Sequence, residues 1–362
     1  MIGIARPTCG RTKMNKKTVE LDYMNAIACL LVILIHVLSA GIERIDTMSW
    51  QSALIYFPWR IAAFVVPLFL YTGAVKMAMQ FENKRVTGAV YLRYALRRIK
   101  KIFLPYAVWV CIYYFCFLAI GYVEGGVGEF FSYLFSGSLA APFYYVIIIM
   151  QFYLLMPLWV WVMRRVPFYL SLAVSLLIWF FLEYYPDITW ALGISFPYGD
   201  RIFLTYIVFW VLGLYAGKNY DRTLEMLTTK KWDKVVCIAL ILIYAWIYYI
   251  RLLGYATPFD ILNVKLIADV LSILVLHFIA VSLLSAHELI KKTLSAIYRS
   301  SFFVFLAHSL FLTAAQRFLD GQGIVRLSAV IGVRALVCYS VPFILYFIWS
   351  RIKAAAGKDR FS

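Results

Sequence analysis

The sequence has few charged residues. Of its 362 residues, 15% are Asp, Glu, Lys or Arg, whereas 64% are hydrophobic. A soluble domain is nearer half apolar and a quarter charged, so this composition excludes an ordinary soluble protein. The apolar residues form long runs between short charged stretches, and they lack the polar–apolar alternation of membrane β-barrel strands. The composition therefore predicts an all-α integral membrane protein.

Acidic residues are especially scarce. The chain has 18 acidic and 35 basic residues, which gives a formal net charge of +17. In a soluble protein this balance would suggest nucleic-acid binding. Here the basic residues cluster between apolar runs, which indicates membrane topology and contact with anionic lipid instead. We therefore expect membrane lipids, and no nucleic acid, among the partners.

Patterns that hold metals or disulfides are also lacking. The six cysteines show no CxxC motif and no metal-ligand spacing, and all except Cys9 lie inside apolar runs. Buried thiols of this kind behave as small apolar residues. We interpret these cysteines as packing residues and expect no metal.

The apolar runs predict about ten transmembrane helices. Basic loops alternate with acidic or Gly/Pro-rich loops along the chain, so the positive-inside rule places both termini in the cytoplasm. The longest loop, about residues 80–101, is basic and is expected to be partly helical along the membrane surface. The spans are expected at roughly 22–41, 55–79, 102–121, 143–163, 167–185, 201–217, 235–253, 263–285, 301–317 and 326–350. The chain is thus divided into a basic cytoplasmic segment (1–21), a ten-helix domain (22–350) and a basic cytoplasmic tail (351–362).

His36 is the first candidate for function, because an ionisable group inside a membrane span is costly. It shares one helical face with Asp22, Asn25 and Cys29. Asn25 and His36 are separated by about three turns, or about 16 Å along the axis. A neutral imidazole can take a proton from a hydroxyl and return it. The alternative is a histidine that only links two helices through a hydrogen bond.

The stretch around His36 resembles a known family. "LDYMNAIACLLVILIH" resembles the first helix of the membrane acyltransferase-3 superfamily, whose pattern is D-x-x-R, ten residues, then His. Five further segments resemble family motifs in the same order: "VVPLFLYTGAVKMA", "RRIKKIFLPYAVW", "MQFYLLMPLW", "FWVLGLYAG" and "SFFVFLAHSLFL". The resemblance extends over nearly the whole chain.

The resemblance implies a multi-pass protein of the bacterial cytoplasmic (plasma) membrane. Members move an acyl group, acetyl or succinyl, from cytoplasmic acyl-CoA to a hydroxyl of a cell-surface or lipid-linked polysaccharide. The family histidines correspond to His36 and His308, which the resemblance implies as catalytic, and the family Ser-Gly pair corresponds to Thr72 and Gly73. The acidic pair of the peptidoglycan-modifying branch is absent at 149–150. The chain looks more like the short branch, which includes the O-acetyltransferase of enterobacterial common antigen and the intercellular-adhesion poly-N-acetylglucosamine protein interpreted as an O-succinyltransferase or an exporter.

The donor site is expected near the cytoplasmic end of the first helix. The family arginine of D-x-x-R is replaced by Asn25, whose amide can donate hydrogen bonds but carries no charge. A dense basic stretch on the same predicted side would attract the phosphates of coenzyme A. Alternatively, this basic stretch serves only to orient the protein in the membrane, by the positive-inside rule, and to bind anionic lipid. The predicted donor-binding residues are Asn25, Arg93, Arg97, Arg98 and Lys101.

Other ionisable groups in the spans have less specific signals. Arg60, at the outer end of the second span, is predicted with Asp22 to bind substrate, and could hold a glycan oxygen or an oxyanion. The alternative for Arg60 is a snorkelling interface anchor. Asp269 and Arg334 are expected to form a structural ion pair, because a lone buried charge would be costly.

Three functions remain open from the sequence. The first is a membrane O-acyltransferase with a glycan or lipid-linked sugar as acceptor. The second is a polysaccharide exporter or flippase of the same fold without acyl transfer, which the neutral Asn25 favours. The third is an assembly partner of polysaccharide synthase components without turnover of its own.

Overall fold

The computed structural model describes residues 18–183, 198–229, 232–255 and 261–358, and within them all regular elements are helical. The α-helices are α1 (Val19–Ile42), α2 (Trp50–Ala62), α3 (Val65–Phe81), α4 (Gly88–Arg98), α5 (Leu104–Ala119), α6 (Val127–Ser136), α7 (Tyr144–Leu154), α8 (Met156–Arg165), α9 (Phe168–Glu183), α11 (Ile207–Lys218), α12 (Tyr220–Thr229), α13 (Trp232–Leu252), α14 (Ile261–Ser282), α15 (Glu288–Gly321) and α16 (Leu327–Lys358). Short turns are η1 (Ile99–Phe103, π-helical), and the 3₁₀ turns η2 (Ala141–Phe143), η3 (Gly199–Arg201), η4 (Phe203–Tyr206) and η5 (Leu283–Ser285).

Seven helical units in the described residues are long and apolar enough to cross a membrane. They coincide with seven of the ten predicted spans and are Val19–Ile42, Trp50–Phe81, Gly88–Ala119, Asp233–Leu252, Val264–Ser285, Glu288–Gly321 and Leu327–Ala355. A bent pair, Val127–Ser136 with Ala141–Leu154, would add an eighth span. The all-α class with multiple membrane helices is therefore confirmed, while the count of ten and the orientation of the termini stay predictions.

The three other predicted spans fall on shorter helices. The span over 143–163 is interrupted at Leu155, because Pro157 in the first turn of α8 has no N–H to continue α7. The described part of α9 has 16 residues and extends to Glu183, the last described residue before the gap at 184–197. α11, with η4 before it, is of similar length.

The predicted division into terminal segments and a membrane domain stays a prediction, and the structure adds detail at the tail and at the basic loop. Residues 1–17 and 359–362 of the predicted terminal segments lie outside the described residues. α16 continues without a break into the predicted tail. The predicted basic loop is helical from Gly88, and η1 joins α4 to α5 just before Pro105, so that the basic stretch belongs to one long helix with the third span.

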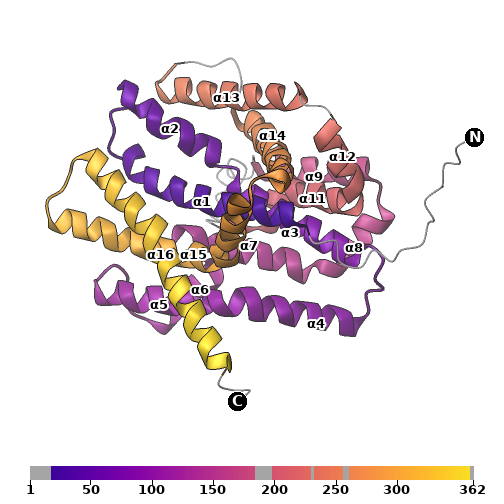
Figure 1. Cartoon of the computed structure of the whole chain (residues 1–362), viewed down its shortest axis with the longest axis horizontal. Helices are drawn as coiled ribbons and strands as arrows, with labels where there is room; N and C mark the ends of the chain where they lie inside the picture. Colours follow the sequence, from indigo (N-terminus) through magenta and orange to yellow (C-terminus); the bar gives the residue numbers. More distant parts are fainter. Residues whose placement is uncertain (1–17, 184–197, 230–231, 256–260, 359–362) are drawn as a thin grey trace, which may run out of the picture.

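α1 lies at the centre of the bundle, in contact with α2, α3, α14, α15 and α16. In Figure 1 the α1–α2, α5–α6 and α15–α16 connections lie on the left, and the α3–α4 connection lies on the right. Arg44 pairs with Asp320 at 3.8 Å, and Arg317 donates to the carbonyl oxygen of Ile120 at 3.1 Å, which ties the left-hand connections together. These three predicted outer loops therefore share one end of the bundle, which we call the outer end; the opposite end is called the inner end.

α3 and α11 pack closely through two glycines of α11. A Cβ atom on Gly213 would lie 2.4 Å from the carbonyl oxygen of Tyr71, and one on Gly217 would lie 2.6 Å from that of Val75. Small residues four apart allow two membrane helices to approach at backbone distance. This contact fixes the position of α3, which carries several of the site residues described below.

We expect Gly213→Ala to destabilise the protein by about 1–3 kcal/mol, because its methyl group must push α11 away from α3. Gly332→Ala in α16 is the matched control, since a Cβ there would meet nothing within 4 Å. Thermal unfolding of both variants in the same detergent measures the difference. Equal unfolding temperatures would contradict the close helix contact.

Candidate functional site

Two histidines meet between α1 and α15. The ring centroids of His36 and His308 are 5.2 Å apart and their planes are inclined by 42°. His308 is completely buried, whereas His36 is half-buried. These are the two histidines that the sequence predicts as catalytic, 272 positions apart in the chain. The structure brings them together, and their catalytic role stays a prediction.

The hydrogen bond of His308 fixes its tautomer. Its Nδ1 lies 3.1 Å from the carbonyl oxygen of Val304, one turn earlier in α15. A carbonyl oxygen can only accept, so Nδ1 must carry the proton and Nε2 must be the bare acceptor. This Nε2 is buried and has no partner among the described residues. A buried acceptor is normally hydrogen-bonded, so this Nε2 is available to accept a hydrogen bond from a donor outside the described residues.

The backbone of His36 is held by α16. Arg334 Nη2 donates to the His36 carbonyl oxygen at 2.6 Å and to Ser39 Oγ at 3.1 Å, and Arg334 Nη1 donates to Gln316 Oε1 at 2.9 Å. The predicted ion pair of Arg334 with Asp269 is wrong. The charges that act on Asp269, in α14, are those of Lys265 and Arg60.

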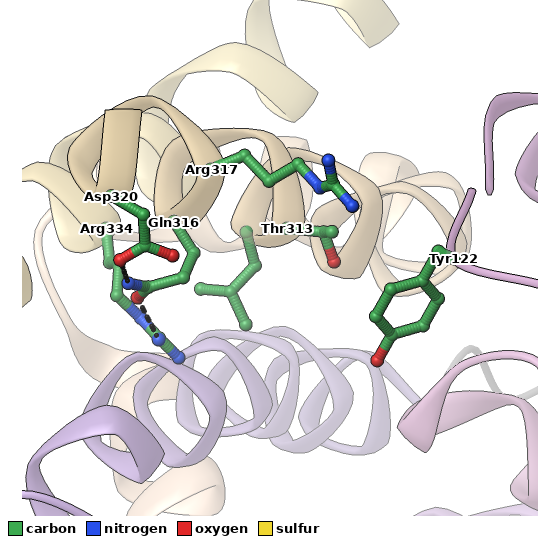
Figure 2. A pocket seen from close by; sticks show the side chains of 7 residues that line it. Tyr122, Thr313, Gln316, Arg317, Asp320 and Arg334 are labelled. Carbon is green, nitrogen blue, oxygen red and sulfur yellow. Dashed lines mark hydrogen bonds between the residues drawn. The ribbon is translucent and has the colours of Figure 1, made fainter. Parts of the chain in front are cut away.

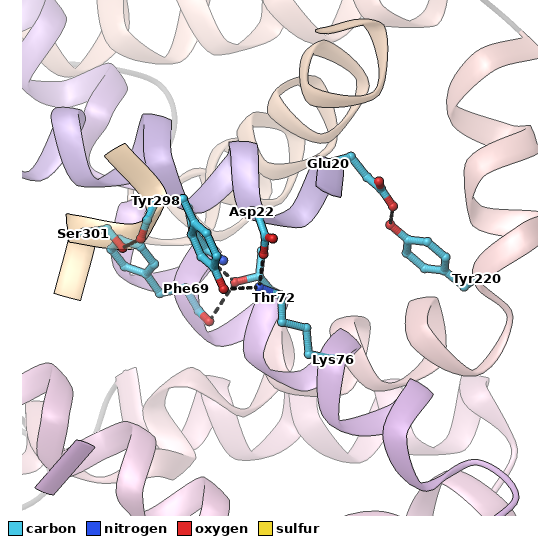
Figure 3. Close-up of polar contacts among 9 residues, drawn as sticks. Glu20, Asp22, Phe69, Thr72, Lys76, Tyr220, Tyr298 and Ser301 are labelled. Atoms are coloured by element: carbon cyan, nitrogen blue, oxygen red, sulfur yellow. Dashed lines mark hydrogen bonds and ion pairs between the residues drawn. The ribbon is translucent and has the colours of Figure 1, made fainter. Parts of the chain in front are cut away.

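At the inner end, α1 and α3 form two polar rungs beside a cavity of about 210 Å³. Thr72 Oγ1 donates to Asn25 Oδ1 at 2.8 Å, and one turn away Lys76 Nζ lies 2.8 Å from Asp22 Oδ1. Figure 3 shows Lys76 reaching between Asp22 and the hydroxyl of Tyr298, which it meets at 3.2 Å. The cavity, which we call the inner cavity, is lined by Asn25, Phe69, Thr72, Gly73, Lys76, Arg98, Tyr145, Tyr153, Tyr298, Ser301, Phe302 and Phe305.

Arg98 is the one predicted donor-binding residue of the basic stretch that lines the inner cavity. Its guanidinium carbon lies 4.1 Å from the ring centroid of Tyr153 and 4.9 Å from that of Tyr94. The other three, Arg93, Arg97 and Lys101, are exposed and line none of the described cavities. The inner cavity thus has two cations, Lys76 and Arg98, and only Lys76 has a carboxylate partner.

An aromatic cluster leads from the inner cavity to the histidines. Phe305 lines the cavity, and its ring centroid lies 6.3 Å from that of His308. Phe69 and Tyr145 pack against Phe305 at 6.3 and 5.4 Å. The floor of the cavity is therefore one ring away from His308, since Phe305 and His308 lie on the same turn of α15.

A second cavity, of about 510 Å³, lies at the outer end, and we call it the outer cavity. Figure 2 shows Tyr122 at one end of it and Gln316, Asp320 and Arg334 at the other. Its floor includes Leu312, one turn of α15 beyond His308. The full lining is Tyr122, Leu312, Thr313, Gln316, Arg317, Asp320 and Arg334.

The two predicted substrate-binding residues lie away from the outer cavity. Asp22 is at the inner end, paired with Lys76. Arg60 packs over the rings of Tyr244 and Tyr248, at 4.9 and 4.3 Å from their centroids, and lines none of the described cavities. Stacking on tyrosine rings is typical of an arginine that anchors a helix at the membrane interface. Substrate binding by Arg60 stays a prediction.

The comparison with protein families decides the class of the chain. The family model described as "Acyltransferase domain" matches residues 18–349. The chain belongs to the acyltransferase-3 family. This acyltransferase-3 match covers α1 to most of α16, so both histidines, both cavities and the polar rungs lie inside the family domain.

Curated relatives of this acyltransferase-3 protein carry a different functional name. It is 24% identical over 329 residues to a probable poly-beta-1,6-N-acetyl-D-glucosamine export protein of Staphylococcus epidermidis, covering 83% of this chain and 82% of the relative. It is 23% identical over 316 residues to the protein of the same name in Staphylococcus aureus (strain MSSA476), covering 83% of each. No solved structure gives a significant match.

The sequence did not predict the partners of two site residues. Lys76 is an ionisable residue inside the predicted second span, and nothing in the sequence placed it beside Asp22. Arg334 was expected to pair with Asp269, whereas in the structure it holds the His36 backbone. Among the described residues, no three His, Cys, Asp or Glu side chains gather as a metal site would require.

Proposed function

We propose that the protein is a membrane O-acyltransferase that moves an acetyl or succinyl group from acyl-CoA, bound at the inner cavity, to a glycan hydroxyl presented from the outer cavity. The glycan would be a cell-surface or lipid-linked polysaccharide at the bacterial cytoplasmic membrane. The observation that carries the proposal is the His36–His308 pair between the two cavities. α15 contributes to all three, with Ser301 and Phe305 at one cavity, His308 at the centre and Thr313 and Gln316 at the other.

The donor end suits acyl-CoA. Arg98 and Lys76 are fixed cations that would hold phosphates, and the Thr72, Ser301 and Tyr298 hydroxyls offer further hydrogen bonds. The aromatic lining leads from these groups toward His308 and would shield the thioester from water. The charge absent at Asn25 would thus be supplied by Arg98, which has no carboxylate partner among the described residues, whereas the charge of Lys76 is balanced by Asp22.

The histidine pair can perform the proton transfers. His36 takes the proton of the acceptor hydroxyl as its oxygen attacks the thioester carbonyl; the C–O bond forms, the C–S bond breaks, and the proton passes to the thiolate of coenzyme A. His308 Nε2 accepts a hydrogen bond from the hydroxyl or from protonated His36. Two imidazolium charges this close in a low-dielectric interior would repel each other strongly, so at most one of the two histidines carries a positive charge at a time.

Purified protein in lipid nanodiscs tests the proposal directly. Acetyl-CoA and succinyl-CoA are supplied in turn with a β-1,6-linked N-acetylglucosamine oligosaccharide, and both coenzyme A release and mass increase of the sugar are measured. Acylated sugar with one donor would support the proposal and identify the donor. Folded protein that binds acyl-CoA but acylates nothing would oppose it, and protein that neither binds nor turns over acyl-CoA would point to an assembly partner.

The second candidate is a polysaccharide exporter, which the printed names of the relatives favour. An exporter needs a passage that admits a sugar chain. The inner and outer cavities share no lining residue, and Phe305 and His308, both buried, lie between them. Export would therefore require α1 and α15 to separate at the histidine pair, whereas acyl transfer needs only the small acyl group to pass.

We expect Arg98→Gln to raise the KM for acyl-CoA by about ten- to a hundredfold, because a charge-assisted hydrogen bond to phosphate contributes roughly 1.5–3 kcal/mol. Arg97→Gln is the matched control: it removes the same charge from the neighbouring, exposed position outside the inner cavity. Its KM should stay within about twofold of the wild type. Steady-state kinetics with saturating acceptor make the comparison, and equal increases in both variants would assign the effect to general surface charge.

A further inference from the structure

The outer cavity has the chemistry of a sugar-binding site. Within its lining, one aromatic ring, two neutral hydrogen-bonding side chains, two guanidinium groups and one carboxylate face a space of about 510 Å³. Tyr122, at one end, is 62% exposed even though the ring of Phe117 packs against it at 4.9 Å between centroids. Gln316 and Asp320 lie at the opposite end, where Gln316 Nε2 donates to Asp320 Oδ1 at 2.8 Å.

The lining excludes two other classes of ligand. A phosphate or other compact anion would meet the Asp320 carboxylate beside the guanidinium groups. A fatty acyl chain would have to displace water from Thr313, Gln316 and Arg317 without replacing their hydrogen bonds. A pyranose ring matches both ends of the cavity. Its C–H groups can pack on the electron-rich face of the Tyr122 ring, and its hydroxyls can donate to and accept from the polar side chains at the other end.

Arg334 adds an independent observation. It is 6% exposed, it lines the outer cavity, and its Nε has no hydrogen-bond partner among the described residues. Its other two nitrogens are engaged, Nη1 with Gln316 and Nη2 with Ser39 and the carbonyl oxygen of His36. A buried guanidinium N–H without an acceptor costs free energy, and a ligand oxygen would remove that cost. The same side chain therefore touches both the cavity and the turn that carries His36.

We propose that the outer cavity is the acceptor subsite, in which a neutral hexosamine unit of the glycan lies on the ring of Tyr122. The hydroxyls of this sugar form hydrogen bonds with the polar side chains of the lining, namely Thr313, Gln316, Asp320 and Arg334. The proposal rests on the proposed function, since it assigns the cavity to the acceptor of that reaction. Leu312 on the cavity floor is one turn from His308, so a sugar here would lie about one helical turn from the histidine pair.

The test is a binding measurement that does not require turnover. A β-1,6-linked N-acetylglucosamine tetrasaccharide is titrated against the protein in nanodiscs, without acyl-CoA, and saturation-transfer NMR gives its Kd. Tyr122→Ala is expected to weaken binding by about tenfold, and Tyr122→Phe to bind as the wild type does. Thr313→Val, which keeps the side-chain shape, is expected to weaken binding several-fold.

Tyr255→Ala is the matched control, because Tyr255 is also 62% exposed but lies outside the cavity, after α13. Its Kd should equal that of the wild type. Equal Kd values for Tyr122→Ala and the wild type, equal weakening by Tyr255→Ala, or no saturable binding by the wild type would each overturn the assignment. Acyl-CoA binding and hydrolysis, measured on the same samples, decide the proposed function separately, because they depend on the inner cavity and the histidines.

Discussion

Replacing His36 with alanine is expected to lower the rate of acyl transfer by about 10²–10⁴-fold, which is the usual contribution of a positioned general base. The side chain makes no hydrogen bond within the described residues, and its backbone is held through the carbonyl oxygen, which alanine retains. The loss should therefore appear in kcat, while the Kd for acyl-CoA at the inner cavity stays within about twofold.

His287→Ala is the control for this variant. His287 is an exposed histidine at the beginning of α15, outside both cavities, so its replacement should leave transfer unchanged. Rates are measured as label transfer from acyl-CoA to the oligosaccharide, with thermal unfolding to show that each variant is folded. Transfer by His36→Ala at more than about a tenth of the wild-type rate would contradict its role as the base.

His308→Gln is expected to lower kcat by about a hundredfold, because a glutamine amide cannot take up a proton and does not keep the rigid imidazole Nε2 in place beside His36. Since His308 is completely buried, part of any effect could come from packing alone. His277 is the matched control: it is also completely buried, its Nδ1 meets the hydroxyl of Tyr71 at 3.2 Å, and it lines neither cavity.

His277→Gln should lower thermal stability about as much as His308→Gln does, and should retain kcat. The comparison is made by unfolding temperature and by kcat at saturating donor and acceptor. Equal losses of kcat in the two variants would show that His308 acts through packing rather than through its Nε2.

The helical class and most spans could be predicted from the sequence, because long apolar runs determine both. The resemblance singled out His36 and His308, but that they meet is known only from the structure. The break in the fourth span could have been predicted too, because Pro157 stands in the middle of the run. That α4 and α5 form one continuous helical unit could not be predicted, since a basic stretch is equally compatible with a surface loop.

Side-chain partners were harder to predict, because they depend on helix rotation. Arg98 is four residues after the buried Tyr94 and so follows the buried face of α4, whereas Arg93 and Arg97 share the exposed face. This helical spacing of Tyr94 and Arg98 could have been recognised in the sequence. The partner of Arg334, Asp269 or the turn of His36, could not be predicted, because it depends on how α14 and α16 are rotated about their axes relative to α1.

The cations of the inner cavity bear on whether the neutral Asn25 favours an exporter. A neutral residue in place of the family arginine favoured an exporter. In the structure Asn25 is engaged with Thr72, and Arg98, which has no carboxylate partner among the described residues, places a cation in the inner cavity. The inner cavity is therefore not short of positive charge, and the replacement by itself no longer separates the two functions.

Sealed proteoliposomes test the central claim most directly, because they separate transfer from export in one vessel. Labelled acyl-CoA, which does not cross the bilayer, is added outside, and the oligosaccharide is enclosed inside. Our account predicts acylated oligosaccharide in the lumen with wild-type protein, none above background with His36→Ala, and retention of the sugar in both. Oligosaccharide that leaves the vesicles without label, with His36 intact and acyl-CoA present, would contradict acyl transfer and establish export.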